Sequence, residues 1–207
     1  MEQYNIALGF DPNDPKTHYK LATALVAQSK IDAGLEHFER ALRLDPKGED
    51  YRYDYGYALE RVGRSDEAAV QYQAAIKFKP KYAPYHYAYA AYLTKTHKFD
   101  EAIPQYREAL RLKPNYIEAH SDLGNALFAK NELEEAKTHY LEAVRLDPRR
   151  AEAHNNLGNI YFQQGQISQA IVQYQEALRL DPHLHIAEEN LRLARASETQ
   201  PQSPSPQ

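Results

Sequence analysis

The stretch EALRLDP, residues 176–182, closes an amphipathic run with a proline, and near-copies of it recur along the chain. The copies are IALGFDP ending at Pro12, RALRLDP at Pro46, AAIKFKP at Pro80, EALRLKP at Pro114 and EAVRLDP at Pro148. Each proline follows the one before it by 34 residues. Proline lacks an N–H and disfavours helical geometry in the preceding residue, so each copy reads as the end of a helix. The spacing predicts one helical unit of 34 residues, used repeatedly.

Apolar and small residues recur at fixed positions when each unit is numbered so that its proline is position 32. Positions 7, 8 and 11 share one helical face in the first half of the unit, and positions 20, 24 and 27 share one in the second half. Position 8 is glycine or alanine, position 24 is aromatic, and position 27 is always alanine. Each unit is therefore predicted to be a helical hairpin in which small residues let the two backbones approach closely. Between the halves, Gly63, Asn131 and Gly165 are expected in the left-handed conformation that ends a helix.

These columns resemble the tetratricopeptide repeat family, whose pattern is W-x2-L-G-x2-Y, then A-x3-F, then P on a 34-residue period. The resemblance covers residues 1 to about 195 and is closest over 151–182. It implies an all-α fold, a right-handed α-solenoid of helical hairpins. It also implies that the first helix of each hairpin lines a concave surface that holds a segment of a partner. The sequence departs from the pattern at the tryptophan position, which holds His18, Arg52, His86, His120 and His154.

The period also predicts how the chain is organised. Residues 1–14 align with the second-helix end of a partial repeat, and residues 185–196 are expected to form an amphipathic capping helix with a polar outer face. Residues 197–207, SETQPQSPSPQ, have little to bury and are expected to be a disordered tail. The complete repeats between these ends are 15–48, 49–82, 83–116, 117–150 and 151–184.

Composition excludes several classes of function. The formal net charge of -4 over 207 residues argues against nucleic acid as a partner, because non-specific binding to phosphates needs a basic surface. No segment approaches the roughly 18 apolar residues that cross a membrane, so no membrane association is expected. The N-terminus has no basic region followed by an apolar run, and we expect a cytoplasmic protein.

No catalytic or metal-binding motif is present, and neither an enzyme nor a cofactor is expected. The chain lacks a glycine-rich phosphate loop, HExxH and GxSxG, and its carboxylates are spread over helix faces among lysines and arginines. The four histidines at position 4 would stand about 10 Å apart in a stack, which is too far to chelate one metal ion.

The face of the first helices that points away from the packing stripe is the candidate binding surface, because positions 5, 6 and 9 lie there. Tyrosines and asparagines suit such a surface, since a phenol offers contact area at low entropic cost and an amide both donates and accepts hydrogen bonds. Packing between helices is the alternative role of the tyrosines, and the sequence leaves the two roles open. The candidate peptide-binding residues are Tyr19, Tyr53, Tyr57, Tyr87, Asn125, Asn155, Asn156 and Asn159.

We interpret the chain as a non-catalytic adaptor that binds a protein or peptide segment. Members of the family that clamp a terminal carboxylate have basic residues at positions 2 and 6 of several repeats, and here only Lys16 and Lys20 fulfil this. The alternative function is the substrate-recognition segment of a larger enzyme such as a glycosyltransferase. A further hypothesis is self-association through the N-terminal half-helix, residues 1–14.

Overall fold

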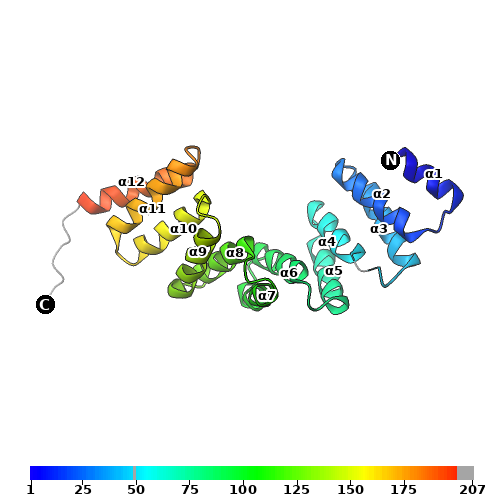
Figure 1. The fold of residues 1–207 in the computed structure, drawn as a ribbon, viewed down its shortest axis with the longest axis horizontal. Helices are drawn as coiled ribbons and strands as arrows, with labels where there is room; N and C mark the ends of the chain where they lie inside the picture. Colours follow the sequence, from blue (N-terminus) through cyan, green and yellow to red (C-terminus); the bar gives the residue numbers. More distant parts are fainter. Residues whose placement is uncertain (49, 200–207) are drawn as a thin grey trace. The chain divides into compact units, whose positions relative to one another are not determined.

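The computed structural model describes residues 1–48 and 50–199, and within them the protein has twelve α-helices and no strand (Figure 1). The helices belong to two compact units, which divide between Thr96 and His97. Unit 1 contains α1 (Glu2–Phe10), α2 (Pro15–Ala27), α3 (Ile31–Leu44), α4 (Tyr51–Arg61), α5 (Ser65–Phe78) and α6 (Ala83–Lys95). Unit 2 contains α7 (Phe99–Leu112), α8 (Ile117–Ala129), α9 (Leu133–Leu146), α10 (Ala151–Gln163), α11 (Ile167–Leu180) and α12 (His185–Thr199).

Consecutive helices pack as hairpins, α2 with α3 and α4 with α5 in unit 1, and α8 with α9 and α10 with α11 in unit 2 (Figure 1). Both units are therefore all-α and are built of the helical hairpins that the 34-residue period predicts. The division between the units falls inside the expected repeat 83–116, so α6 belongs to unit 1 and α7 to unit 2.

Each hairpin turns at a residue with a positive φ. The expected left-handed conformation is confirmed at Gly63 (φ 79°), Asn131 (φ 62°) and Gly165 (φ 73°). Ser29 (φ 61°) and His97 (φ 59°) occupy the same repeat position and adopt the same conformation, although neither residue type signals it. The turn closes because the N–H of the next residue returns to the first helix, as in Arg64 N to Leu59 O at 2.9 Å.

The small residues of the first helices lie directly against the aromatic residues of the second. A Cβ added to Gly56 would lie 2.9 Å from the ring of Tyr72, and one added to Gly158 would lie 2.4 Å from the ring of Tyr174. Gly124 meets Tyr140 in the same way, at 2.6 Å. The expected close approach of the two backbones is thus confirmed in these three hairpins, and the tyrosine ring fills the space that the missing methyl group leaves.

The histidines at the tryptophan position of the repeat tie each hairpin to the end of the preceding helix. His120 Nε2 donates to the carbonyl oxygen of Pro114 at 2.9 Å, and Arg52 Nη2 donates to that of Pro46 at 3.1 Å. These carbonyls belong to the loops where the proline has ended a helix, so the bonds satisfy acceptors that the helix cannot reach. The same contact is made by His18 to Pro12, His86 to Pro80 and His154 to Pro148.

Helix α12 extends further than the sequence predicts. It runs to Thr199 rather than ending at residue 196, and Ser168 Oγ of α11 donates to Glu198 Oε1 at 3.2 Å, which holds this last turn in place. The remainder of the expected tail, residues 200–207, lies outside the described residues. Among the described helices, none combines the length and the apolar character that a membrane span requires.

Candidate binding surfaces

A row of hydrogen-bonded asparagines crosses the first-helix face of unit 2. We call it the amide row; it consists of Asn125 on α8, Asn155, Asn156 and Asn159 on α10, and Asn190 on α12. Asn156 Nδ2 donates to Asn125 Oδ1 at 2.9 Å, and Asn155 Nδ2 donates to Asn156 Oδ1 at 3.2 Å. Asn190 Nδ2 lies 3.0 Å from both Asn155 Oδ1 and Asn159 Oδ1. The row therefore links three helices through side-chain amides.

Buried tyrosine hydroxyls fix the direction of the amides. Tyr140 Oη donates to Asn125 Oδ1 at 2.8 Å, and Tyr174 Oη donates to Asn159 Oδ1 at 2.9 Å. Burial disfavours the phenolate and raises the pKa of Tyr174 to about 12, so its hydroxyl remains a donor at neutral pH. Burial and the nearby Asp122 carboxylate raise the pKa of Tyr140 in the same direction. Both amide oxygens are thus already occupied by protein donors.

The consequence is a surface that offers donors rather than acceptors. Among the described residues, Asn159 Nδ2 makes no hydrogen bond, and Asn125 Nδ2 has only a long contact of 3.5 Å to Asp122 Oδ1. A side-chain amide carries two N–H donors, so both nitrogens can still bond to acceptors of a ligand. Carbonyl oxygens of a peptide backbone are acceptors of this kind.

An apolar pocket lies beside the amide row. It has a volume of about 240 Å³, and Phe128, Phe162 and Leu193 form its apolar wall. Asn159 and Asn190 line the same pocket, so an apolar side chain within it would have its backbone next to amide donors. An apolar cavity with a few fixed polar groups is typical of ligand sites in proteins.

The tyrosines of unit 1 divide between packing and exposure. Tyr19 stacks on Tyr51 with ring centroids 4.6 Å apart, and Tyr53 stacks on Tyr85 at 5.3 Å. Packing, the alternative that the sequence left open, therefore accounts for much of the surface of Tyr19 and Tyr53. Tyr57 is 52% exposed and lies on the open side of α4.

A second pocket, of about 370 Å³, lies between α2 and α4 of unit 1. Its floor is apolar, with Val26 and Phe38 buried beneath it, and Tyr57 forms one side. The carboxylate of Asp54 also lines it and accepts a hydrogen bond from Tyr19 Oη at 2.5 Å. We call this cavity the α2–α4 pocket; Thr23, Ala27 and Arg61 complete its lining.

The expected site residues are found in different environments. Asn125 and Tyr57 are exposed, whereas Asn156, Asn159, Tyr19, Tyr53 and Tyr87 are half-buried. Asn155 differs from the expectation of direct contact: it is 5% exposed and both polar atoms of its amide are bonded within the row. Because its side chain turns toward Asn190 of α12, it supports the row from beneath.

Sequence reasoning missed three supporting residues. Asn190 belongs to the expected capping helix, and its place in the amide row was not predicted. Tyr140 and Tyr174 belong to the expected core, and the contact of their hydroxyls with the surface amides was not predicted either. Glycine at position 8 faces the ring of a tyrosine at position 24 in three repeats. Two of these repeats have asparagine at position 9, and there the tyrosine hydroxyl donates to that asparagine.

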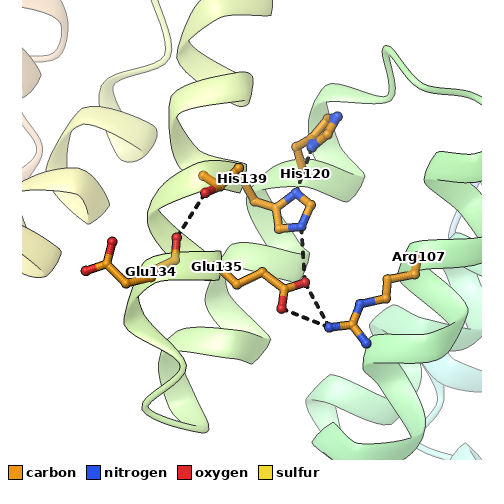
Figure 2. A network of polar contacts seen from close by, with 6 residues as sticks. Arg107, His120, Glu134, Glu135 and His139 are labelled. Atoms are coloured by element: carbon orange, nitrogen blue, oxygen red, sulfur yellow. Dashed lines mark hydrogen bonds and ion pairs between the residues drawn. The ribbon is translucent and has the colours of Figure 1, made fainter.

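A separate polar network joins α7, α8 and α9 in unit 2 (Figure 2). His120 Nδ1 and His139 Nδ1 lie 3.0 Å apart, and His139 Nε2 lies 3.8 Å from Glu135 Oε1. Arg107 Nη2 donates to both oxygens of the Glu135 carboxylate, at 2.8 and 3.0 Å. Since His120 uses Nε2 to bond Pro114, its Nδ1 must accept, and His139 must carry its proton on Nδ1.

The same arrangement occurs in the first repeat, where His18 Nδ1 lies 2.9 Å from His37 Nδ1. Burial and the partner histidine lower the pKa of both His37 and His139. Among the described residues, no cluster of three or more histidine, aspartate or glutamate side chains is arranged to hold a metal ion. We interpret the two pairs as structural links between the helices of one hairpin.

Comparison with protein families finds repeats over most of the chain. A family profile described as "TPR repeat" matches residues 92–130 and 124–165. Two profiles described as "Tetratricopeptide repeat" match residues 151–184 and 19–84. A search of curated proteins finds no match.

Many solved structures are similar to the chain. YrrB, described as a TPR protein with an unusual peptide-binding site, has a TM-score of 0.79 at 21% identity, with 91% of this chain and 97% of that chain covered. The MamA 41-end structure from Desulfovibrio magneticus RS-1 has a TM-score of 0.77 at 20% identity, covering 82% and 96%. A thermophilic TPR protein from Thermus thermophilus, TTC0263, has a TM-score of 0.64 at 20% identity, covering 88% and 100%. At these identities the likeness concerns the fold.

Proposed function

Because this chain belongs to the tetratricopeptide repeat family, we propose that it is a non-catalytic adaptor that binds a peptide segment of another protein on the first-helix face of unit 2. The observation that carries the proposal is the amide row, in which the unused donors of Asn159 lie next to an apolar pocket. The peptide-binding site named for YrrB, which has a similar fold, also supports it.

The chemistry of the amide row favours a polypeptide ligand. A peptide backbone presents carbonyl acceptors at regular intervals, whatever its side chains, and fixed donors bind them without reorganising. The pocket beside Asn159 adds a place for one apolar side chain, which contributes about 1.5–3 kcal/mol when it is fully buried. Backbone bonds would give affinity, and the pocket would select the residue that enters it.

Replacing Asn159 by aspartate tests the donor role with little change of shape. In Asn159→Asp the two carboxylate oxygens can still accept from Tyr174 Oη and Asn190 Nδ2, but no N–H remains for a ligand. Asn115→Asp is the matched control, since Asn115 is exposed in the loop before α8 and the substitution makes the same change of charge.

The probe is a random 12-residue peptide library displayed on phage and selected on the immobilised full chain. The tightest peptides are synthesised, and their dissociation constants are measured by fluorescence anisotropy. We expect at least a tenfold loss of affinity in Asn159→Asp, or about 1.4 kcal/mol, and no change in Asn115→Asp. Failure to enrich any peptide over a blank surface, or equal affinities for the wild-type chain and Asn159→Asp, would overturn the proposal.

A further inference from the structure

The α2–α4 pocket of unit 1 contains a half-buried carboxylate that has no cationic partner. Asp54 accepts one hydrogen bond, from Tyr19 Oη, and no lysine or arginine among the described residues forms an ion pair with it. Burial raises the pKa of Asp54, and the neighbouring Asp50 carboxylate raises it further. A charge held in this way is costly, because burial removes water without supplying an opposite charge.

The lysine and arginine side chains near the pocket contact other groups or lie too far from Asp54 to pair with it. Arg61 also lines the pocket, but it follows Asp54 by two helical turns, about 10 Å, and its Nη1 donates to Val26 O at 2.9 Å. Lys95 of α6 lies 4.0 Å from Glu60 of α4. On α2, Lys16 and Lys20 line a separate cavity with Asp50.

The other walls suit the alkyl part of a long side chain. Val26 and Phe38 form an apolar floor, and the ring of Tyr57 stands exposed beside it. Lysine and arginine have an aliphatic stem and a charged end, and their charged groups are attracted to the faces of aromatic rings. A pocket of about 370 Å³ has room for such a side chain.

We propose that the α2–α4 pocket receives a lysine or arginine side chain of a peptide ligand bound on unit 1, with Asp54 as its counter-ion. The cation replaces the compensating charge that Asp54 lacks, and Tyr57 and Phe38 contact its stem. This inference rests on the proposed function, because it assumes that the chain binds peptides. It adds a place of contact on unit 1 and the chemical class of the ligand residue that enters it. The same carboxylate disfavours an acidic side chain in the pocket.

The test uses the same phage library, selected in parallel on the wild-type chain, on Asp54→Asn and on Asp32→Asn. Asparagine at position 54 keeps the oxygen that accepts from Tyr19 and removes only the charge. Asp32 is exposed on α3 and does not line the pocket, and its replacement removes the same charge. We expect peptides selected on the wild-type chain and on Asp32→Asn to share a lysine or arginine at one aligned place, and those selected on Asp54→Asn to lack it.

Peptide affinities then test whether the basic residue of the peptide contacts Asp54. A selected peptide is compared with its variant in which that basic residue is norleucine, which keeps the aliphatic stem. We expect the norleucine peptide to bind the wild-type chain at least tenfold more weakly, and both peptides to bind Asp54→Asn with the same affinity. The comparison on the wild-type chain alone remains decisive if Asp54→Asn does not fold.

Two outcomes overturn the inference while leaving the proposed function intact. One is a set of peptides that bind the wild-type chain without a shared basic residue. The other is a norleucine peptide that binds the wild-type chain as tightly as its parent, or that loses the same affinity on Asp54→Asn. If no peptide is enriched at all, the proposed function and this inference both fail.

Discussion

At the residue scale, the position-4 and position-23 side chains form a link in four of the repeats that sequence reasoning overlooked. Position 23 holds histidine in two repeats and glutamine in three, and its partner at position 4 is histidine or arginine. His154 Nδ1 lies 2.9 Å from Gln173 Oε1, which corresponds to the His120 to His139 contact one repeat earlier. The repeated pairing gives the position-4 histidines a structural role within their hairpins.

The histidine pairs predict a loss of stability in acid. The folded pKa values of His37 and His139 are lowered, so the unfolded chain takes up protons first as the pH falls. This contribution to stability is fully present above the ordinary histidine pKa of about 6.5 and is lost below it. Glu135 favours the charged form of His139. The contribution of His139 to this pH dependence is therefore smaller than burial alone would make it.

Glutamine at these positions provides the matched variant, because Gln71, Gln105 and Gln173 occupy position 23 in the other repeats. A glutamine amide can rotate to accept from a protonated histidine, so the double variant His37→Gln and His139→Gln should lose less stability between about pH 7.5 and about pH 5.5. Urea unfolding followed by circular dichroism measures both proteins at the two pH values. Equal losses of unfolding free energy would show that the pairs do not set the pH dependence.

At the element scale, the turn residue determines how easily each hairpin closes. The left-handed conformation costs a residue with a Cβ roughly 1–2 kcal/mol, and only two of the five turns have the glycine that avoids this cost. Ser29 therefore stores strain in the α2–α3 turn. Gly63 has no atom within 4 Å of where its Cβ would be, so an alanine there would be strained only by its backbone conformation.

Exchanging these residues should move stability in opposite directions. We expect Ser29→Gly to stabilise its hairpin by about 0.5–1 kcal/mol and Gly63→Ala to destabilise the α4–α5 hairpin by about 1 kcal/mol. Each hairpin of a repeat array contacts only its neighbours, so hydrogen exchange of the amides of α2 to α5 reads the effect locally. Slower exchange in Gly63→Ala, or faster exchange in Ser29→Gly, would contradict this account.

The sequence predicted the elements well because the repeat itself carries the information. The 34-residue period and the glycine, alanine and aromatic columns predict the hairpins, and the left-handed turns follow wherever glycine or asparagine stands at position 15. Ser29 and His97 were not predicted, since the tertiary fold imposes the turn on residues without that preference. The end of α12 was missed because a single hydrogen bond to Glu198 extends it beyond its amphipathic pattern.

The candidate site was less predictable. The sequence identifies which side chains share the first-helix face, but it does not give the direction of a hydrogen bond. Asn155 and Asn156 are adjacent and look alike in the sequence, yet Asn155 is buried because it bonds to Asn190. Tyr53 and Tyr57 stand one helical turn apart, and only Tyr53 finds a stacking partner, Tyr85. Packing between helices decided both differences.

At the scale of the whole molecule, the two terminal helices present different outer faces. Helix α12 buries Ala187, Leu191 and Ala194, and on its exposed side Arg192 bonds to Glu189. Arg192 occupies the repeat position that is glycine or alanine in the hairpins, where an aromatic ring would have to pack. The outer face of α12 is therefore polar at the place where the first helix of a hairpin receives the aromatic ring of its own second helix. Helix α1 has no buried residue.

The apolar side chains of α1 predict weak self-association. Ile6 is 55% exposed and Phe10 is 88% exposed, and apolar surface of this kind is removed from water when two copies pair through the same helix. A nine-residue helix offers far less than the roughly 1,200 Å² of a stable interface, so the dimer should form only at high protein concentration, with a dissociation constant of about 0.1–1 mM. Sedimentation velocity over a concentration series measures the mass.

Phe10→Glu should keep the chain monomeric, whereas Val70→Glu, which places the same charge at a 61% exposed apolar position on α5, should leave association unchanged. A monomer at every concentration, or equal effects of the two substitutions, would show that α1 does not pair.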